Sequence, residues 1–214
     1  MNATFDFQRY LKEGWYLFRD NASNILVAAI IFVAIHFVAN FIPFVSLLIS
    51  GPLMGGMYYV ILDAEQGKEF NAMRIFDGFR LKFAPLVLVA ILSTVFMIGG
   101  LILLILPGFL IMGWYLFPYL YVLDKDMDFW PAMEASRKIG FKNHANVFLL
   151  AVLFGILNLI GFLLFGVGLL VSVPYTLCVT IKAYEHLKDV GLNDDASHQP
   201  RHRTPPPPPI PPTI

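Results

Sequence analysis

The sequence predicts an all-α, polytopic membrane protein, a bundle of six transmembrane helices arranged as three hairpins with amphipathic helices at the surface. Three observations predict this fold class. Of the 214 residues, 57% are hydrophobic and only 14% are charged, whereas soluble domains are about 45–50% apolar and about 25% charged. The apolar residues form runs long enough to cross a bilayer. The charged residues lie between and outside these runs.

Composition also excludes several classes of protein. Fifteen Lys and Arg balance fifteen Asp and Glu, so the chain lacks the basic excess of a nucleic-acid-binding protein and we expect no nucleic-acid partner. A single cysteine, Cys178, excludes a disulfide framework and a cysteine-based zinc site. The mean hydropathy of +0.68 makes the lipid bilayer the expected partner.

Six apolar runs approach the roughly 20 residues that a membrane-spanning helix needs. We predict spans at Ile25–Ile42, Phe44–Leu62, Ala84–Leu106, Phe109–Leu123, Val147–Phe165 and Val167–Ile181. Short turns join them in pairs, around Pro43, Pro107–Gly108 and Gly166–Gly168. Because these turns have no room for a domain, residues 1–190 are expected to form one transmembrane domain of three hairpins.

The first twenty residues predict an amphipathic helix on the membrane surface. Phe7, Tyr10, Leu11, Trp15 and Phe18 recur at helical spacing with charged residues between them. No small-residue cleavage site follows the apolar run, so the segment does not resemble a cleavable signal peptide.

The positions of the cations predict the orientation in the membrane. All fifteen lie before the first span, between spans two and three, between spans four and five, or after span six: Arg9, Lys12, Arg19, Lys68, Arg74, Arg80, Lys82, Lys125, Arg137, Lys138, Lys142, Lys182, Lys188, Arg201 and Arg203. Cytoplasmic loops carry the excess of Lys and Arg. Both termini and both polar loops are therefore expected on the cytoplasmic side.

The hairpins look like three copies of one unit, at about residues 7–67, 68–128 and 129–189. A shift of 61 residues aligns three stretches in which an amphipathic segment leads into a span: Gly14–Ile30, Ile75–Ile91 and Ser136–Val152. Parallel repeats are related by an axis along the membrane normal. We therefore predict a pseudo-three-fold internal repeat.

Four polar residues within the spans are candidates for function: His36, Asn40, Ser50 and Asn158. Polar side chains in the bilayer usually face the bundle interior. An interhelical hydrogen bond is the favoured interpretation for His36, Asn40 and Asn158, and a proton or substrate site is the alternative.

Three further residues are candidates for breaks in the spans: Gly51, Pro52 and Pro174. Broken helices line the binding sites of transporters. Gly and Pro are also common in transmembrane helices for packing and bending, which is the favoured interpretation here.

The same 61-residue shift superposes three acidic residues, Asp63, Asp124 and Glu185, each at the cytoplasmic end of a hairpin. Negative charge is unfavourable at the C-terminus of a helix because of the helix dipole. Two interpretations remain open: each acid pairs with Arg or Lys on a surface helix and ties its hairpin to a neighbour, or interfacial water alone stabilises it.

Residues 191–214 differ in composition and predict a disordered, proline-rich cytoplasmic tail. Pro205–Pro209 favours an extended polyproline II conformation. Arg203 ahead of this run fits a ligand for an aromatic groove on a protein partner, with an unbound tail as the favoured interpretation.

The sequence resembles the membrane domain of bacterial glycerophosphoryl diester phosphodiesterases and related six-span membrane proteins, over about residues 5–188. The stretches that carry the resemblance are Gly14–Asn21, Gly51–Gly56 (GPLMGG), Ile75–Phe79 (IFDGF), Leu103–Gly108 (LLILPG), Trp130–Lys138 (WPAMEASRK) and Pro174 to Tyr184. The resemblance implies a bacterial cytoplasmic-membrane location. It implies no established chemistry for stand-alone members, and the roughly 25 residues after the transmembrane domain (191–214) are not expected to hold the catalytic domain.

No nucleophile–base pair, phosphate-binding loop or metal-ligand cluster emerges from the sequence, so we expect neither an enzyme nor a cofactor. The leading interpretation is a scaffold or assembly partner for a membrane or cytoplasmic protein. The alternative is a small-solute or lipid-handling transporter. A cavity that touches His36, Asn40, Ser50 or Asn158 would favour the second, and a filled bundle the first.

Overall fold

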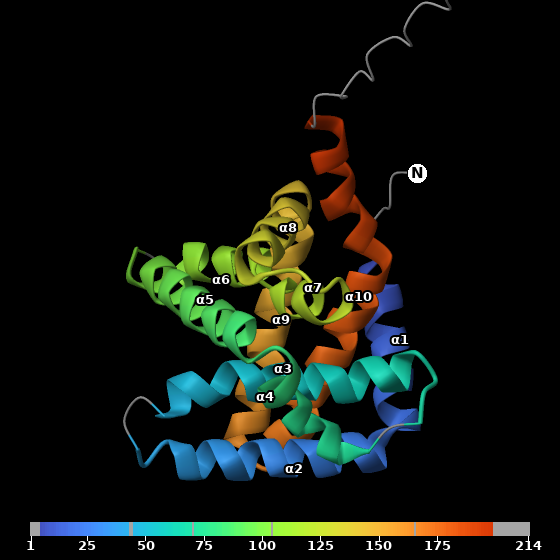
Figure 1. The fold of residues 1–214 in the computed structure, drawn as a ribbon, viewed down its shortest axis with the longest axis vertical. Helices are drawn as coiled ribbons and strands as arrows, with labels where there is room; N and C mark the ends of the chain where they lie inside the picture. The colour runs from blue at the N-terminus through green and yellow to red at the C-terminus, as the bar shows by residue number, and fades with distance from the viewer. Residues whose placement is uncertain (1–4, 43–44, 70, 104, 165, 199–214) are drawn as a thin grey trace, which may run out of the picture.

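The computed structural model describes residues 5–42, 45–69, 71–103, 105–164 and 166–198, and this part of the chain is all-helical without strands (Figure 1). The first elements are α1 (Phe7–Asp20), α2 (Ala22–Ala39) and α3 (Val45–Glu65). Next come a short 3-10 helix, η1 (Ala72–Phe76), then α4 (Asp77–Leu81), α5 (Phe83–Leu103), α6 (Ile105–Trp114) and α7 (Pro118–Asp124). The last are α8 (Phe129–Lys142), α9 (His144–Leu163) and α10 (Leu169–His198).

Within the described ranges, four helical segments are long and apolar enough to cross a membrane. They are α2, α3, α9 and the Phe83–Gly100 part of α5. The fold is therefore an all-helical one with four candidate membrane spans. The predicted fourth and sixth spans fall in α6–α7 and in α10, which are not among these four.

The predicted fourth span, Phe109–Leu123, is not one continuous helix. Helix α6 ends at Trp114, and α7 begins at Pro118. Proline has no N–H, so Pro118 cannot donate to the Trp114 carbonyl four residues earlier. The helical hydrogen bonds are therefore interrupted at residues 115–117.

The side chain of Ser136 from α8 replaces the missing hydrogen bonds at this interruption. Its Oγ donates to the Trp114 carbonyl at 2.7 Å and accepts from the Phe117 N–H at 3.1 Å. Ser136 is fully buried. One hydroxyl thus satisfies both a carbonyl and an N–H that would otherwise be left without partners inside the protein.

Helix breaks, the alternative to packing and bending at Gly51, Pro52 and Pro174, are not seen. Helix α3 runs through Pro52 and α10 runs through Pro174. Gly51 serves close packing, because a Cβ added there would lie 2.2 Å from the Leu86 carbonyl oxygen of α5. The interruption of a predicted span occurs instead before Pro118, where a neighbouring hydroxyl supplies the missing partners.

The second predicted turn, at Pro107–Gly108, and the tail also differ from the prediction. Helix α6 begins at Ile105, so Pro107 lies in its first turn, a position that tolerates proline because its N–H is not needed there. Helix α10 continues to His198, whereas a disordered tail was predicted from residue 191. No proline occurs after Pro174 until Pro200, so nothing in this stretch stops the helix. Residues 199–214, including Arg203 and Pro205–Pro209, lie outside the described residues.

The amphipathic N-terminal helix packs its apolar face on the protein. Tyr10, Gly14 and Leu17 of α1 are buried, and α1 contacts α10 extensively. A Cβ added at Gly14 would lie 2.6 Å from Val179 Cγ2, so the two helices approach closely. Trp15 on the same helix remains exposed. The periodicity that predicted a membrane-surface helix thus also creates a docking face for α10.

Consecutive long helices pack in pairs, α2 with α3, α5 with α6, and α9 with α10. In Figure 1 the pairs diverge, since α2 and α3 run across the view whereas α9 and α10 run along it.

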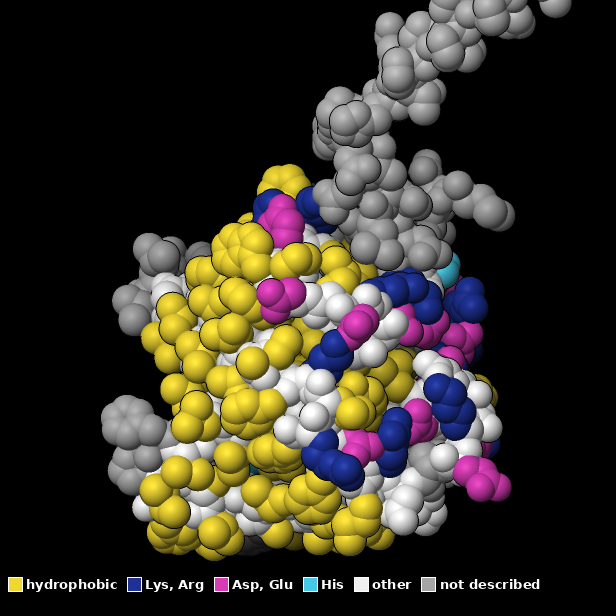
Figure 2. Space-filling model, in the orientation of Figure 1, with side chains coloured by type: hydrophobic (Ala, Val, Ile, Leu, Met, Phe, Trp, Pro, Cys, Tyr) yellow, Lys and Arg dark blue, Asp and Glu magenta, His cyan; other side chains and the backbone are white. Residues whose placement is uncertain are grey.

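Figure 2 shows charged side chains gathered toward one side of the visible face and hydrophobic side chains covering the other. We call the end that carries Asp63, Asp124 and Lys182 the charged end.

We predict that Ser136→Ala lowers the thermal unfolding midpoint of the detergent-solubilised protein. Two buried backbone groups lose their partner, which costs about 2–4 kcal/mol. Ser50→Ala is the matched control, because the hydrogen bond that the Ser50 hydroxyl donates within the described residues goes to the Leu47 carbonyl of its own helix, at 3.0 Å. Equal midpoints for the two variants would contradict the bridging role of Ser136.

Candidate functional site: a central cavity

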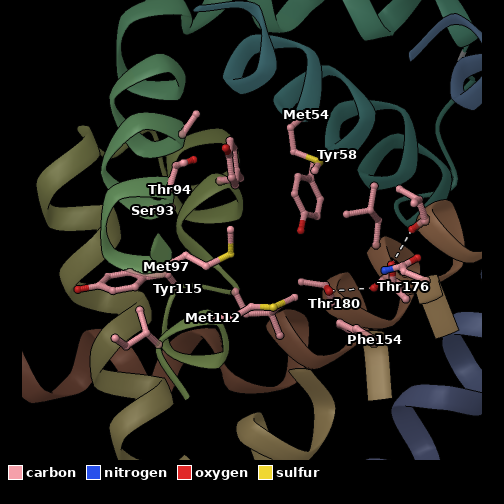
Figure 3. Close-up of a pocket in the computed structure, with 17 residues that line it drawn as sticks. Met54, Tyr58, Ser93, Thr94, Met97, Met112, Tyr115, Phe154, Thr176 and Thr180 are labelled. Carbon is pink, nitrogen blue, oxygen red and sulfur yellow. Dashed lines mark hydrogen bonds between the residues drawn. The ribbon is translucent and has the colours of Figure 1, made fainter. Parts of the chain in front are cut away.

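A cavity of about 350 Å³ lies between α3, α5, α6, α7, α9 and α10 (Figure 3). This volume is within the range of small-molecule pockets, about 300–1,000 Å³. Figure 3 shows Tyr58 projecting from α3 into the space, opposite the α5 residues Ser93 and Met97. The bundle is therefore not filled at its centre.

One face of α5 forms a wall of the cavity. Ala90, Ser93, Thr94 and Met97 all line it, and their spacing of three and four residues places them on one side of the helix. Along α5 the wall changes from the small or hydroxyl-bearing side chains of Ala90, Ser93 and Thr94 to the thioether of Met97 one turn later.

Two tyrosines and a threonine form the end of the cavity nearest the charged end. The Tyr58 and Tyr119 rings stack with centroids 5.9 Å apart. Thr180 lies beside them with 1% of its surface exposed, and its hydroxyl donates to the Thr176 carbonyl at 2.8 Å. The positions Tyr58, Tyr119 and Thr180 come from α3, α7 and α10, so all three predicted repeats contribute to this end.

The cavity wall carries no charge: none of the described residues that line it is Asp, Glu, Lys, Arg or His. Most are aliphatic, aromatic or methionine, and the polar atoms are hydroxyls together with the Asn158 amide. An apolar pocket with a few polar groups is typical of a ligand site. It suits an uncharged molecule, because burying an unpaired charge is costly.

Ser93 supplies a polar atom that is free to bind a ligand. Its Oγ is buried and has no hydrogen-bond partner among the described residues. Trp114 Nε1 is also buried without a partner, but Trp114 does not line the cavity. A buried polar atom without a partner costs about 1–3 kcal/mol. A ligand that hydrogen-bonds to Ser93 would recover part of that cost.

Asn158 is the one candidate among the predicted intramembrane polar residues that lines this cavity, within the part of the chain that the structure describes. Its Oδ1 accepts from the Ser172 hydroxyl at 2.9 Å, which links α9 to α10. This is the interhelical hydrogen bond expected of a polar residue within a span.

His36, Asn40 and Ser50 lie away from the cavity and form hydrogen bonds within their own helices. His36 Nδ1 lies 3.3 Å from the Phe32 carbonyl oxygen, and Asn40 Nδ2 donates to the His36 carbonyl at 2.9 Å. The interhelical hydrogen bonds expected for His36 and Asn40 are therefore not seen. A polar side chain on a helix can bond the carbonyl one turn earlier, and sequence spacing cannot distinguish this arrangement from an interhelical one.

Among the three acidic residues, Asp63 has the kind of partner that the pairing interpretation describes. Its carboxylate lies 2.6 Å from Arg74 Nε of η1, and Arg74 also contacts Asp77 at 2.7 Å. Asp63 is buried. This ion pair joins the end of α3 to the segment that precedes α5, as the pairing interpretation requires.

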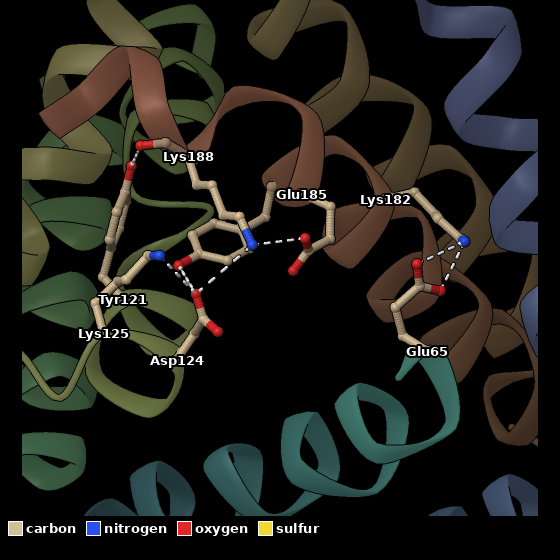
Figure 4. A network of polar contacts seen from close by, with 8 residues as sticks. Glu65, Tyr121, Asp124, Lys125, Lys182, Glu185 and Lys188 are labelled. Atoms are coloured by element: carbon tan, nitrogen blue, oxygen red, sulfur yellow. Dashed lines mark hydrogen bonds and ion pairs between the residues drawn. The ribbon is translucent and has the colours of Figure 1, made fainter. Parts of the chain in front are cut away.

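The other two acids bond to α10 instead of a surface helix (Figure 4). Asp124 accepts from the Tyr184 hydroxyl at 2.9 Å, and Lys188 Nζ lies 3.9 Å away. Glu185 pairs with Lys188 on its own helix at 2.6 Å. The pairing interpretation is thus wrong in its choice of element for Asp124 and Glu185.

Sequence reasoning missed two residues of this network, Glu65 and Tyr184. Lys182 Nζ lies 2.6 Å from Glu65, which ties α10 to α3. Burial and the neighbouring Asp124 carboxylate raise the pKa of Tyr184, so its hydroxyl remains a donor to Asp124. The signal for Glu65 was available, because it lies one turn from the end of an apolar run and two residues after Asp63.

A second hollow, of about 530 Å³, lies at the charged end between α1, α3 and α10. Its charged residues pair with one another or with a neighbour: Arg9 with Glu13, Lys182 with Glu65, and Glu185 with Lys188. The Tyr10 hydroxyl is hydrogen-bonded to His186 Nδ1. The Lys182–Glu65 and Tyr10–His186 contacts join the helices around this hollow. Because its charged side chains are already paired, the hollow offers less to a ligand than the central cavity does.

Comparisons with known proteins add no assignment. No protein-family model matches the chain, and neither the curated proteins nor the solved structures include a match.

We predict that Asp63→Asn lowers the unfolding midpoint in detergent, because it removes one of the two carboxylates that contact the Arg74 guanidinium and the one that links α3 to η1. The cost is about 2 kcal/mol, below the range for fully buried pairs because the Arg74 side chain is 37% exposed. Glu13→Gln is the control, since the Arg9–Glu13 pair lies at the surface and its loss is expected to change the midpoint little. An unchanged midpoint in Asp63→Asn would show that the pair does not tie α3 to η1.

Proposed function

We propose that this chain is a non-catalytic integral membrane protein that handles a small solute or a lipid-like molecule in its central cavity. The observation that carries the proposal is the uncharged cavity of about 350 Å³ between the helix pairs. A protein that served only as a scaffold would need no such space, and close packing of the core is the usual state of a helical bundle. The cavity therefore favours solute or lipid handling over scaffolding.

The character of the cavity narrows this proposal. Ion-coupled carriers place ionisable residues within their spans, whereas this cavity is lined by hydroxyls, one amide and apolar groups. The candidate that it touches is Asn158; His36, Asn40 and Ser50 lie elsewhere. An apolar or amphipathic molecule fits this wall better than an ion or a strongly polar solute.

We further propose six spans in three hairpins related by a pseudo-three-fold repeat. The helix bounds support this arrangement: α2, α5 and α9 begin at Ala22, Phe83 and His144, in equal steps along the chain. Each follows a shorter helical segment (α1, η1–α4 and α8, respectively). Each then leads into a second helix or helix pair (α3, α6–α7 and α10, respectively). The fourth and sixth spans would be α6–α7 and the first part of α10.

The proposed location is the bacterial cytoplasmic membrane, with both termini on the cytoplasmic side. The gathering of charged side chains toward one side of the molecule supports this orientation (Figure 2). The resemblance to the membrane domain of glycerophosphoryl diester phosphodiesterases supports the bacterial location and no activity.

Cysteine accessibility tests the topology. In a Cys178→Ser background, we expect Asn40→Cys in intact cells to react with a membrane-impermeant maleimide, because it lies at the turn of the first hairpin. Gln66→Cys, just beyond the charged end of α3, should react only after the inner membrane is permeabilised. Reaction of both or neither before permeabilisation would contradict the proposed orientation.

Filling the cavity tests the function. We expect the wild-type protein, purified from membranes in mild detergent, to retain a small molecule that native mass spectrometry detects as added mass. Val173→Trp places an indole in the cavity wall and should reduce that retained fraction at least five-fold.

Val171→Trp is the matched control on the same helix. Val171 is 43% exposed and does not line the cavity. If both variants retain the molecule like the wild type, it is bound at the lipid-facing surface and the cavity is not the site. If the wild type retains none, and crosslinking in membranes captures a protein partner that depends on residues 193–214, the scaffold interpretation replaces this proposal.

A further inference from the structure

We propose that the cavity binds an uncharged, single-chain amphiphile. Its polar group would lie beside Ser93, and its hydrocarbon chain would pass between Met97 and Met112 toward Phe109. This inference rests on the proposed function and specifies the class of molecule, its orientation and its route.

The absence of charge from the described cavity wall selects the class of molecule. A phosphate or ammonium head group inside the cavity would have no counter-charge and would lose its hydration, which is costly in a buried, apolar site. A hydroxyl or carbonyl group needs only one or two hydrogen bonds. The wall thus favours a neutral head group over that of a phospholipid.

Ser93 selects the position of the polar group. Its Oγ is buried without a partner, whereas the hydroxyls of Thr176 and Thr180 already donate to backbone carbonyls of their own helix, both at 2.8 Å. Ser93 can therefore donate to a ligand without losing another hydrogen bond. A ligand oxygen at this point would satisfy a group that the protein leaves unsatisfied.

The positions of Met97 and Met112 indicate the direction of the ligand's hydrocarbon chain. They line the central cavity and also a second, smaller cavity of about 110 Å³, whose other walls are Gly108 and Phe109. This smaller cavity lies between α5 and α6, near the end of the hairpin that is away from the charged end. Methionine side chains are flexible and adapt to irregular apolar shapes, so the pair can part around a methylene chain.

Stacked aromatic rings close two of the other directions. At the charged end, Tyr58 stacks on Tyr119, and beyond them lies the ion-pair network of Figure 4. Between α5 and α8, the Phe96 and Tyr115 rings stack with centroids 5.3 Å apart. The hollow beyond these rings holds about 20 Å³, room for about one water molecule. The adjoining cavity that shares Met97 and Met112 thus favours a route for the hydrocarbon chain between α5 and α6.

Photolabelling tests the proposal on the full chain in detergent. The probe is hexadecanol with a diazirine at the chain end, and the charged comparison is a phosphatidylglycerol that carries the same photoreactive chain. We expect the alcohol to label peptides that contain Met97, Phe109 or Met112, and excess unlabelled hexadecanol to compete. Phosphatidylglycerol should label lipid-facing residues instead, without competition by the alcohol.

Two pairs of variants identify the site. Met97→Trp should reduce competed labelling at least five-fold, whereas Ile98→Trp should not; both positions are exposed, at 43% and 50%, so a Trp is expected to be tolerated, but only Met97 lines the cavities. Ser93→Ala should weaken competition by hexadecanol about five-fold, the effect of one hydrogen bond. Ser50→Ala, which removes a hydroxyl bonded within its own helix, should leave it unchanged.

The proposal is overturned if labelling by the alcohol is not competed, if phosphatidylglycerol labels the same peptides under the same competition, or if Ser93→Ala and Met97→Trp behave like their controls. These failures are distinct from failure of the proposed function. A small molecule retained by the wild type and lost in Val173→Trp would still place a ligand in the cavity, although not the neutral amphiphile.

Discussion

The requirement that every backbone polar group find a partner away from water governs this fold. Within hydrocarbon no solvent can replace a missing helical hydrogen bond. Pro118 removes one such bond from a long apolar stretch, and Ser136 of α8 supplies a donor to Trp114 and an acceptor for Phe117. The interruption places Tyr115 in the cavity wall. A single buried hydroxyl thus connects α8 to the shape of the cavity.

Ion pairs and hydrogen bonds at the charged end join the helices to one another. The Asp63–Arg74 and Glu65–Lys182 pairs, and the contact of Asp124 with Tyr184, join α3, α7 and α10 to each other or to adjacent segments. The helix pairs are fastened at the charged end and diverge from it. These contacts hold the ends of α3, α7 and α10 together, and the centre of the bundle can therefore remain unfilled.

The chemistry of the cavity follows from the same limits. A side chain that lines a span must tolerate an apolar environment, so polarity enters the wall as hydroxyl groups that can bond within their own helix, as those of Thr176 and Thr180 do. Ser93 departs from this rule because its hydroxyl has no partner within the described chain. An unsatisfied buried hydroxyl lowers the stability of the protein, and a bound molecule that hydrogen-bonds to Ser93 would reduce this cost.

The sequence by itself determined the helical class, the membrane environment and the positions of most helices, because hydropathy and charge act locally along the chain. It also selected Asp63, whose charge at a helix end called for a partner. The partners of Asp124 and His36 depended on which helix lies beside them, and residue spacing holds no information on that choice. The cavity is likewise a tertiary property: Tyr58, Ser93 and Thr176 are unremarked members of three separate helices. Only the angle at which the helix pairs diverge brings these side chains around one space and leaves that space unfilled.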